Sequence, residues 1–439
     1  MSTFQTVLQM ILKKFTLTKD DVNILDVNKR SPLHWAGAHG SLDQVKMIAK
    51  LGADIGLVDV EGRTALHWAA ASPAPRPAQL VAAMLSLRPS GGRGSVAAAR
   101  DHEGHTALQL AARAAASPAL VAALAAAPGT ELDAVDHRGR GALHWAAAAG
   151  QQEVVAVLLG AGASCGLLDE GGASPWHLAV QGGHLGTVRA MAGAGRPQAR
   201  DSQHRTPLMW AVALARLDLV PVLGAGEGGG VDCRDQSGYT ALHIAAANNV
   251  LAALQPLVEL GAALELGNEA GETALVVAAR LGHQEVLAAL LRCGARPGTT
   301  DARGRGALHA AASAGQLAAV QCLVSSPGTE LEARDGQGRT ALMMASYGGH
   351  AAVARLLLEA GAALDRQDGE GMCALHWAVS RGHGEVARLL VEAGAYTNHV
   401  ARTEAGQLTP LDTALRAEDE DLASLLVAAR VRLGWAGLV

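Results

Sequence analysis

One motif recurs about every 33 residues along the 439-residue chain, and this repetition constrains the fold more than any other feature. Each copy is centred on an apolar anchor inside a segment that resembles T-A-L-H or T-P-L-H. The anchors are Leu33, Leu66, Leu108, Leu143, Trp176, Leu208, Leu242, Leu275, Leu308, Leu342, Leu375 and Leu411. A fixed period of this length predicts an array of stacked units rather than two or three globular domains.

Residues at fixed offsets from the anchors divide each unit into a turn and two short helices. An Asp or Asn stands seven residues before eleven of the anchors, where it favours a turn. Gly or Asn follows most anchors by seven residues, and Gly follows many of them by nineteen, which marks the ends of two helices. Six threonines are placed to cap the first helix: Thr64, Thr106, Thr206, Thr240, Thr273 and Thr340.

The composition requires the units to pack against one another. The chain is 49% hydrophobic but only 3% aromatic, so small side chains must supply most of the buried surface. The second helix of each unit carries an apolar stripe, for example Val386, Leu389 and Leu390. Because two helices of about eight residues cannot bury this stripe alone, neighbouring units must stack.

The pattern D-x-x-G-x-T-A-L-H-x-A-A, repeated with this period, resembles the ankyrin repeat. The resemblance implies an all-α solenoid of about twelve helix-turn-helix repeats with hairpin-like turns, whose concave side combines the turns with the first helices. Residues 1–25 are predicted to form a partial repeat with a second helix and a turn, because Val7, Leu8, Ile11 and Leu12 resemble a second helix. Residues 26–403 would contain eleven repeats, and residues 404–439 a terminal capping repeat.

One interval, between Leu66 and Leu108, is longer than the others at 42 residues. The excess residues include Ser72, Pro73, Pro75 and Pro77 and the segment 89–94, all of which favour loops. We therefore predict a loop insertion around residues 72–95.

Charge, cysteine usage and hydropathy exclude several classes of protein. A net charge of −5 provides no basic field, so nucleic acid is not expected as a partner. The five cysteines form no C-x-x-C pair, which indicates buried thiols in a reducing compartment. Neither a signal peptide nor an apolar run of 18 residues is found, so we expect a soluble cytoplasmic protein without membrane insertion.

The sequence provides no grouping of reactive side chains that would make an enzyme or hold a cofactor. The histidines that follow the anchors are one repeat apart, so they would form a ladder, whereas a metal ion needs three or four groups at one point. We expect each imidazole to bond across its turn or to the next repeat. The glycine-rich segment 224–229 follows a predicted helix instead of a strand, and no G-K-[ST] motif is present. We therefore predict no catalytic residue, no metal site and no cofactor.

Two sets of residues are candidates for protein binding. The first set occupies the turn position three residues before the anchor, where side chains of successive repeats would line up: Arg63, His105, Arg140, Arg205, Tyr239, Arg305 and Arg339. The arginines would suit an acidic or phosphorylated peptide, or each would pair with a turn Asp. The second set is aromatic, on first helices: Trp68, Trp145 and Trp210. These side chains would be binding anchors, or would pack between adjacent first helices.

The order of local variants along the array resembles the ankyrin array of inversin-type proteins. In order, these variants are D-V-N-K-R-S-P-L-H-W from Asp26, the expanded unit, L-M-W-A from Leu208, Y-G-G from Tyr347 and T-P-L-D from Thr409. The resemblance implies a scaffold at the cilium or cytoskeleton that binds dishevelled and nephrocystins and modulates Wnt signalling. Calmodulin is not expected as a partner, because the sequence lacks the I-Q-x-x-x-R-G pattern of that family.

These observations favour a non-enzymatic scaffold for protein interactions, of inversin type. The alternative is a substrate-recognition or targeting subunit for a ubiquitin ligase, a phosphatase or a membrane protein. A stable partner of one of those kinds would distinguish the alternative from the scaffold.

Overall fold

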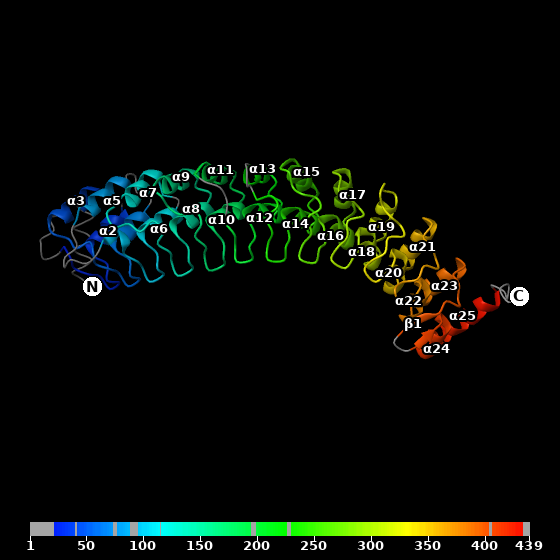
Figure 1. The fold of residues 1–439 in the computed structure, drawn as a ribbon. Helices are drawn as coiled ribbons and strands as arrows, with labels where there is room; N and C mark the ends of the chain where they lie inside the picture. Colours follow the sequence, from blue (N-terminus) through cyan, green and yellow to red (C-terminus); the bar gives the residue numbers. More distant parts are fainter. Residues whose placement is uncertain are drawn as a thin grey trace. The chain divides into compact units, whose positions relative to one another are not determined.

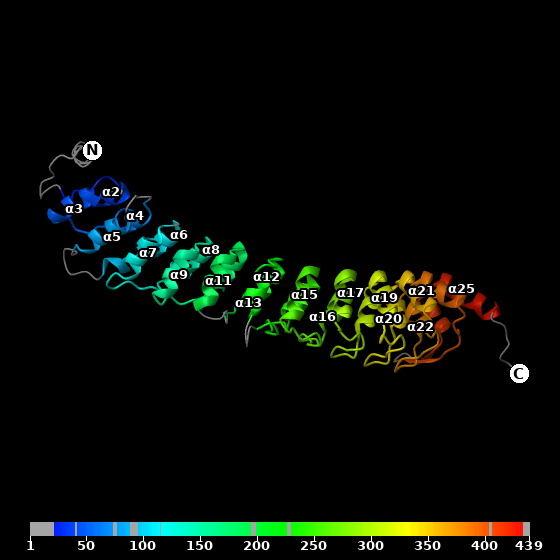
Figure 2. The same ribbon diagram turned by 90° about the horizontal axis from the view of Figure 1, so that it is seen from above.

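A computed structural model describes residues 22–39, 42–72, 77–87, 95–114, 116–194, 199–225, 230–403 and 406–432. The described helices fall into two units, Met1–Gly230 and Val231–Val439. Figures 1 and 2 show that each unit consists of helix pairs joined by extended turns. The predicted all-α repeat array is therefore confirmed.

The first unit contains the pairs of repeats 1 to 6. The first helices of these repeats are α2 (Pro32–His39), α4 (Ala65–Ala70), α6 (Ala107–Arg113), α8 (Ala142–Ala148), α10 (Pro175–Gly182) and α12 (Pro207–Ala213). The second helices are α3 (Leu42–Lys50), α5 (Pro77–Leu85), α7 (Pro118–Ala125), α9 (Gln152–Gly160), α11 (Leu185–Ala194) and α13 (Val220–Gly224). A short 3-10 helix, η1 (Val96–Ala98), precedes the third turn. Within the unit, each kind of helix packs against its own kind in the neighbouring repeat, which forms two layers.

The second unit contains repeats 7 to 12 with the same two layers. The first helices of these repeats are α14 (Ala241–Ala247), α16 (Ala274–Leu281), α18 (Ala307–Ser313), α20 (Ala341–Gly348), α22 (Ala374–Ser380) and α24 (Pro410–Arg416). The second helices are α15 (Leu251–Glu259), α17 (Gln284–Arg292), α19 (Leu317–Val324), α21 (Ala351–Glu359), α23 (Gly384–Glu392) and α25 (Glu420–Arg432). The strands β1 (Ala401–Thr403) and β2 (Gly406–Leu408) pair antiparallel in the turn of repeat 12.

Helix ends follow the signals that the sequence contains. All six predicted threonines are N-caps of first helices, and the hydroxyl of Thr106, for example, accepts the backbone N–H of Gln109. Gly150 follows α8 with a φ of +71°. A Cβ at this position would lie 2.6 Å from the imidazole of His184 in the next repeat, so both the backbone and the neighbour require glycine.

The core consists of the anchors and the stripe of the second helices, as predicted. Leu33 and Leu66 are fully buried between first helices, and Leu80 and Leu120 are fully buried between second helices. The apolar surface removed from water is therefore shared by neighbouring repeats, which explains why a short helix pair is stable only in an array.

The predicted loop insertion is only partly described. Pro77, which we predicted as a loop former, is the first residue of α5, so that part of the expectation is wrong. Proline is tolerated at a first helical position because the N–H that it lacks has no intrahelical partner there. Residues 73–76 and 88–94 lie outside the described part of the chain, as do residues 1–21 of the predicted partial repeat.

Candidate protein-binding face

The turns and the exposed positions of the first helices form one continuous surface within each unit, which we call the turn–helix face. Successive turns are joined by backbone hydrogen bonds, such as the one from the N–H of His102 to the carbonyl of Glu61, at 2.9 Å. Side chains on this face are therefore held at repeated, fixed positions.

The turn Asp organises each copy of the face. In repeat 2, Asp59 Oδ1 accepts the backbone N–H groups of Glu61 and Arg63, both at 2.9 Å. Its Oδ2 accepts Arg63 Nε at 3.2 Å and Trp68 Nε1 at 3.0 Å. In repeat 6, Asp201 accepts the corresponding bonds from Arg205 and Trp210. One carboxylate thus closes the turn and fixes two large side chains.

These contacts also keep the turn carboxylates ionised. Burial by itself would raise the pKa of Asp59, Asp201 and Asp335. Each of these carboxylates accepts hydrogen bonds from backbone N–H groups later in the turn and from an Arg or Trp side chain, and these bonds outweigh the effect of burial. The pKa of all three carboxyl groups therefore lies below its ordinary value. These three carboxylates are therefore ionised at neutral pH.

Most of the predicted arginine stripe is engaged in ion pairs. Arg63, Arg205, Arg305 and Arg339 each pair with the Asp of their own turn at 2.8–3.2 Å. Arg140 instead reaches Asp169 of the next repeat at 3.3 Å. The ion-pair alternative is therefore confirmed for these five side chains, and their guanidinium groups do not form a free basic stripe.

The predicted tryptophans are neither fully buried nor free. Trp68, Trp145 and Trp210 are half-buried, and the indole N–H of each donates to the Asp of its own turn at 2.9–3.1 Å. An Arg from the same turn lies over each ring, with Cζ 4.7–5.2 Å from the ring centroid. Packing accounts for part of each ring, and the remainder is presented on the turn–helix face.

The two remaining candidates differ from the arginines. His105 is 4% exposed and lies between two carboxylates, with Nδ1 3.3 Å from Asp101 and Nε2 3.4 Å from Asp136. Tyr239 is half-buried, and its ring centroid is 5.4 Å from that of His243. His105 therefore joins the turns of repeats 3 and 4, whereas Tyr239 packs within its own repeat.

The histidine ladder has the structural role that we expected. In repeat 2, His67 Nδ1 accepts the N–H of Thr64 at 3.0 Å, and Nε2 lies 3.0 Å from the carbonyl of His105 in the next repeat. This pattern requires a neutral ring with its proton on Nε2. Burial lowers the pKa below 6.5 at seven such positions: His34, His67, His144, His177, His243, His309 and His376.

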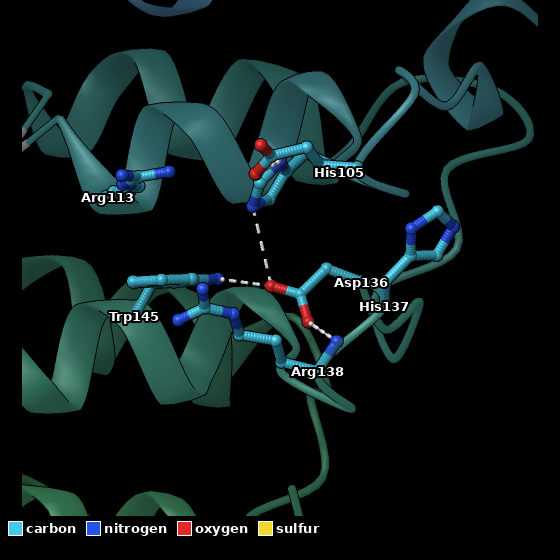
Figure 3. A pocket seen from close by; sticks show the side chains of 7 residues that line it. His105, Arg113, Asp136, His137, Arg138 and Trp145 are labelled. Atoms are coloured by element: carbon cyan, nitrogen blue, oxygen red, sulfur yellow. Dashed lines mark hydrogen bonds and ion pairs between the residues drawn. The ribbon is translucent and has the colours of Figure 1, made fainter. Parts of the chain in front are cut away.

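Sequence reasoning missed a polar pocket of about 230 Å³ at repeats 3 and 4 (Figure 3). Arg113, at the end of α6, lies over the Trp145 ring of α8 at 5.0 Å. The exposed Arg138 is on the turn below it, and Glu103 and Asp136 also line the pocket. Arg113 stands five residues after the anchor Leu108. An arginine at this fixed distance from the anchor is the sequence feature that could have identified it.

A second pocket, of about 280 Å³, lies on repeats 1 to 3. Its lining includes the Trp68 ring, the small side chains of Ala38 and Ala71, and Leu110 of α6. The second unit has a different arrangement at the register of Arg113. There Arg280 donates Nε and Nη2 to the two carboxylate oxygens of Glu272, at 3.1 and 3.2 Å.

The cysteines correct one expectation. Cys373 is buried, but Cys165, Cys233, Cys293 and Cys322 are half-exposed, so four of the five predicted buried thiols are wrongly assigned. Cys165 and Cys233 lie between helices, Cys293 is the C-cap of α17, and Cys322 is on α19 but is not one of its buried residues. In the described part of the chain, no group of three or more His, Cys, Asp or Glu could hold a metal ion.

Among the residues that the structure describes, no helix is both long and apolar enough to span a bilayer.

Comparison with known families identifies the class of protein. The sequence matches the family described as "Ankyrin repeats (3 copies)" over residues 5–87, 80–169, 143–226, 216–301, 289–368, 308–403 and 361–433. The chain therefore belongs to the ankyrin-repeat family. Among curated proteins, it is similar to human "Ankyrin repeat domain-containing protein 63", with 38% identity over 107 residues. The match covers 24% of this chain and 28% of that protein.

Proposed function

We propose that this protein is a non-enzymatic scaffold that binds other proteins on the turn–helix faces of its repeats. Ankyrin repeats are protein-binding modules, and membership of the family supports the general part of this proposal. The observation that carries it is the repeated Trp–Asp–Arg unit, seen at Trp68, Trp145 and Trp210. Each unit holds a half-buried indole in one orientation, and rigid aromatic surface is a common source of binding energy.

We further propose that the scaffold is of inversin type, located in the cytoplasm and at the cilium. This part rests on the shared order of sequence variants from Asp26 to Thr409. The expected partners of such a scaffold are dishevelled and nephrocystins, and its expected effect is to modulate Wnt signalling. A role as a targeting subunit for a ubiquitin ligase, phosphatase or membrane protein is the alternative result of the same experiment.

The test is affinity purification of the full chain from ciliated cells, followed by mass spectrometry. A variant with Trp68→Ala and Trp145→Ala should lose the specific partners. A matched control with Gln152→Ala and Glu153→Ala changes exposed residues of α9 outside the face and should retain them. Circular dichroism of both variants checks that the repeats remain folded.

The identity of the recovered proteins separates the two levels of the proposal. Dishevelled or ciliary proteins that depend on the tryptophans would support the inversin-type role. A specific ligase, phosphatase or channel would contradict that role but retain the scaffold. Partners that bind the double Trp variant as well as the wild type would contradict binding through this face.

A further inference from the structure

We propose that repeats 2 to 4 bind an extended peptide that combines one apolar side chain with one carboxylate side chain, about three residues apart. This inference rests on the proposed function and specifies the chemistry of the partner. It is carried by two pockets of the first unit, one beside the Trp68 ring and one lined by both Arg113 and Arg138.

The apolar side chain would enter the pocket beside Trp68. In repeats 1 and 2, the register five residues after the anchor holds Ala38 and Ala71, which are too small to cover the indole. Leu110 of α6 also lines this pocket. With about 280 Å³ of space, the pocket has room for a Leu or Phe side chain.

The carboxylate would pair with Arg113. Among the described residues, no Asp or Glu lies within ion-pair distance of this exposed guanidinium, which instead lies over the face of the Trp145 ring. Arg138 adds a second exposed cation at the same pocket (Figure 3). An arginine stacked on an aromatic ring is held in place and keeps its N–H groups for a bidentate bond to a carboxylate.

The acidic residues of the pocket favour a carboxylate over a phosphate group. Glu103 and Asp136 both line it, and Asp136 is already bonded to His105 and Trp145. A ligand with a single negative charge can sit on Arg113 with little repulsion from these groups, whereas a phosphate with nearly two charges meets more.

The spacing follows from the repeat. Leu110 and Arg113 are three residues apart on α6 and therefore lie on one side of the helix, so α6 contributes one lining residue to each pocket. Adjacent helices in a stack are about 10 Å apart. An extended chain advances about 3.3 Å per residue, so one repeat corresponds to about three residues of the partner.

The experiment is selection of random peptides on the full-length chain, followed by affinity measurement with fluorescent peptides. We expect enrichment of sequences in which Leu or Phe and Asp or Glu are about three positions apart. Arg113→Gln should weaken their binding about tenfold, the equivalent of one charge-assisted bond. Arg280→Gln is the matched control, because that arginine occupies the same register but is paired with Glu272, and should change affinity less than about twofold.

Different results overturn different statements. Selected peptides that bind the wild type but contain no acidic residue, or bind Arg113→Gln equally well, would contradict this inference and leave the scaffold proposal intact. Preference for phosphoserine over Glu would contradict the assignment of a carboxylate. Failure of every peptide and of every cellular partner to depend on Trp68 and Trp145 would contradict the scaffold proposal itself.

Discussion

Repeats 3 and 8 depart from the common turn in similar ways, yet the arginine that they share is unpaired in repeat 3 and paired with a carboxylate in repeat 8. Each has an arginine five residues after its anchor, Arg113 and Arg280. In repeat 8 the residue three before the anchor is Glu272, which neutralises Arg280 through two hydrogen bonds. In repeat 3 that position is His105, which bonds to turn carboxylates and leaves Arg113 on Trp145. The chemistry of the face therefore depends on pairing within a repeat more than on the number of charges.

Both repeats also lack the buried histidine that seven other repeats share. The largest effect that we expect is a dependence of folding stability on pH, caused by these seven histidines. The shared histidines are neutral in the folded chain because burial lowers their pKa below the 6.5 of an exposed imidazole. Unfolded chains bind more protons below pH 6.5, so the stability present above that pH should be lost as the pH falls toward the lowered values. Denaturant titrations at about pH 7.5 and about pH 5.5 should show a lower midpoint at the more acidic pH.

Replacing one histidine by the residue that repeat 3 uses sharpens this test. Gln109 accepts the N–H of Thr106 and donates to two carbonyls of the next repeat, so it performs the same bonding without titrating. His67→Gln should therefore reduce the pH dependence. An unchanged pH dependence in His67→Gln would show that the buried imidazoles are not its source.

The next effect comes from giving repeat 3 the residue of repeat 8. Gln109→Val, which copies Val276, removes the partners of the Thr106 N–H and of the Ala134 carbonyl, whereas the Arg140 carbonyl still accepts the N–H of Asp136. A buried group left without a partner costs about 1–3 kcal/mol, so we expect these two groups to cost about 2–6 kcal/mol together. Equilibrium urea unfolding measures it. Gln255→Val, at an exposed position of α15, is the control and is expected to change stability by less than about 0.5 kcal/mol.

Most of the architecture could be predicted because the signals that produce it are local. The threonine caps, the left-handed glycines and the turn Asp each act within a few residues, and within the described ranges they appear where the sequence indicates. The assignment of Pro77 was wrong because proline serves both loops and first helical positions. Neither the residues next to Pro77 nor the 42-residue interval distinguishes a loop from the start of a helix at this position.

The site was harder to predict because it depends on contacts between repeats. The sequence places Arg140 and Arg205 at the same register, but Arg140 bonds to the Asp of the next repeat and Arg205 to its own. The choice depends on side-chain torsions and on the identity of the neighbouring turn. The importance of Arg113 likewise becomes visible only when Trp145, one repeat away, is seen beneath it.

A smaller effect should follow from making repeat 8 resemble repeat 3. Glu272→Gln removes the charge that neutralises Arg280 but keeps hydrogen-bonding atoms, so the loss of stability should be about 1 kcal/mol or less. The freed arginine should strengthen binding of an acidic peptide to the second unit by a few fold. Fluorescence anisotropy with a Glu-containing peptide and its Gln counterpart measures this. Equal binding of the two peptides would show that pairing with Glu272 does not decide the charge of the face.

The smallest effect that we expect is a difference in stability between losing an arginine that has an aromatic neighbour and losing one that does not. Arg205 pairs with Asp201 and lies 5.2 Å from the Trp210 centroid, whereas Arg305 pairs with Asp301 in a repeat where Ala310 replaces the tryptophan. Both pairs are partly exposed, so Arg305→Gln should cost about 0–1 kcal/mol. Arg205→Gln should cost about 0.5 kcal/mol more, because it also loses the cation–π contact.

Paired urea titrations can resolve this difference if both variants are also made in a Trp210→Phe background. The gap between the two arginines should narrow there, since phenylalanine offers a weaker π face and no N–H for Asp201. A gap that persists unchanged in the Trp210→Phe background would mean that the indole does not hold Arg205, and that the turn carboxylate alone orients the arginines of both units.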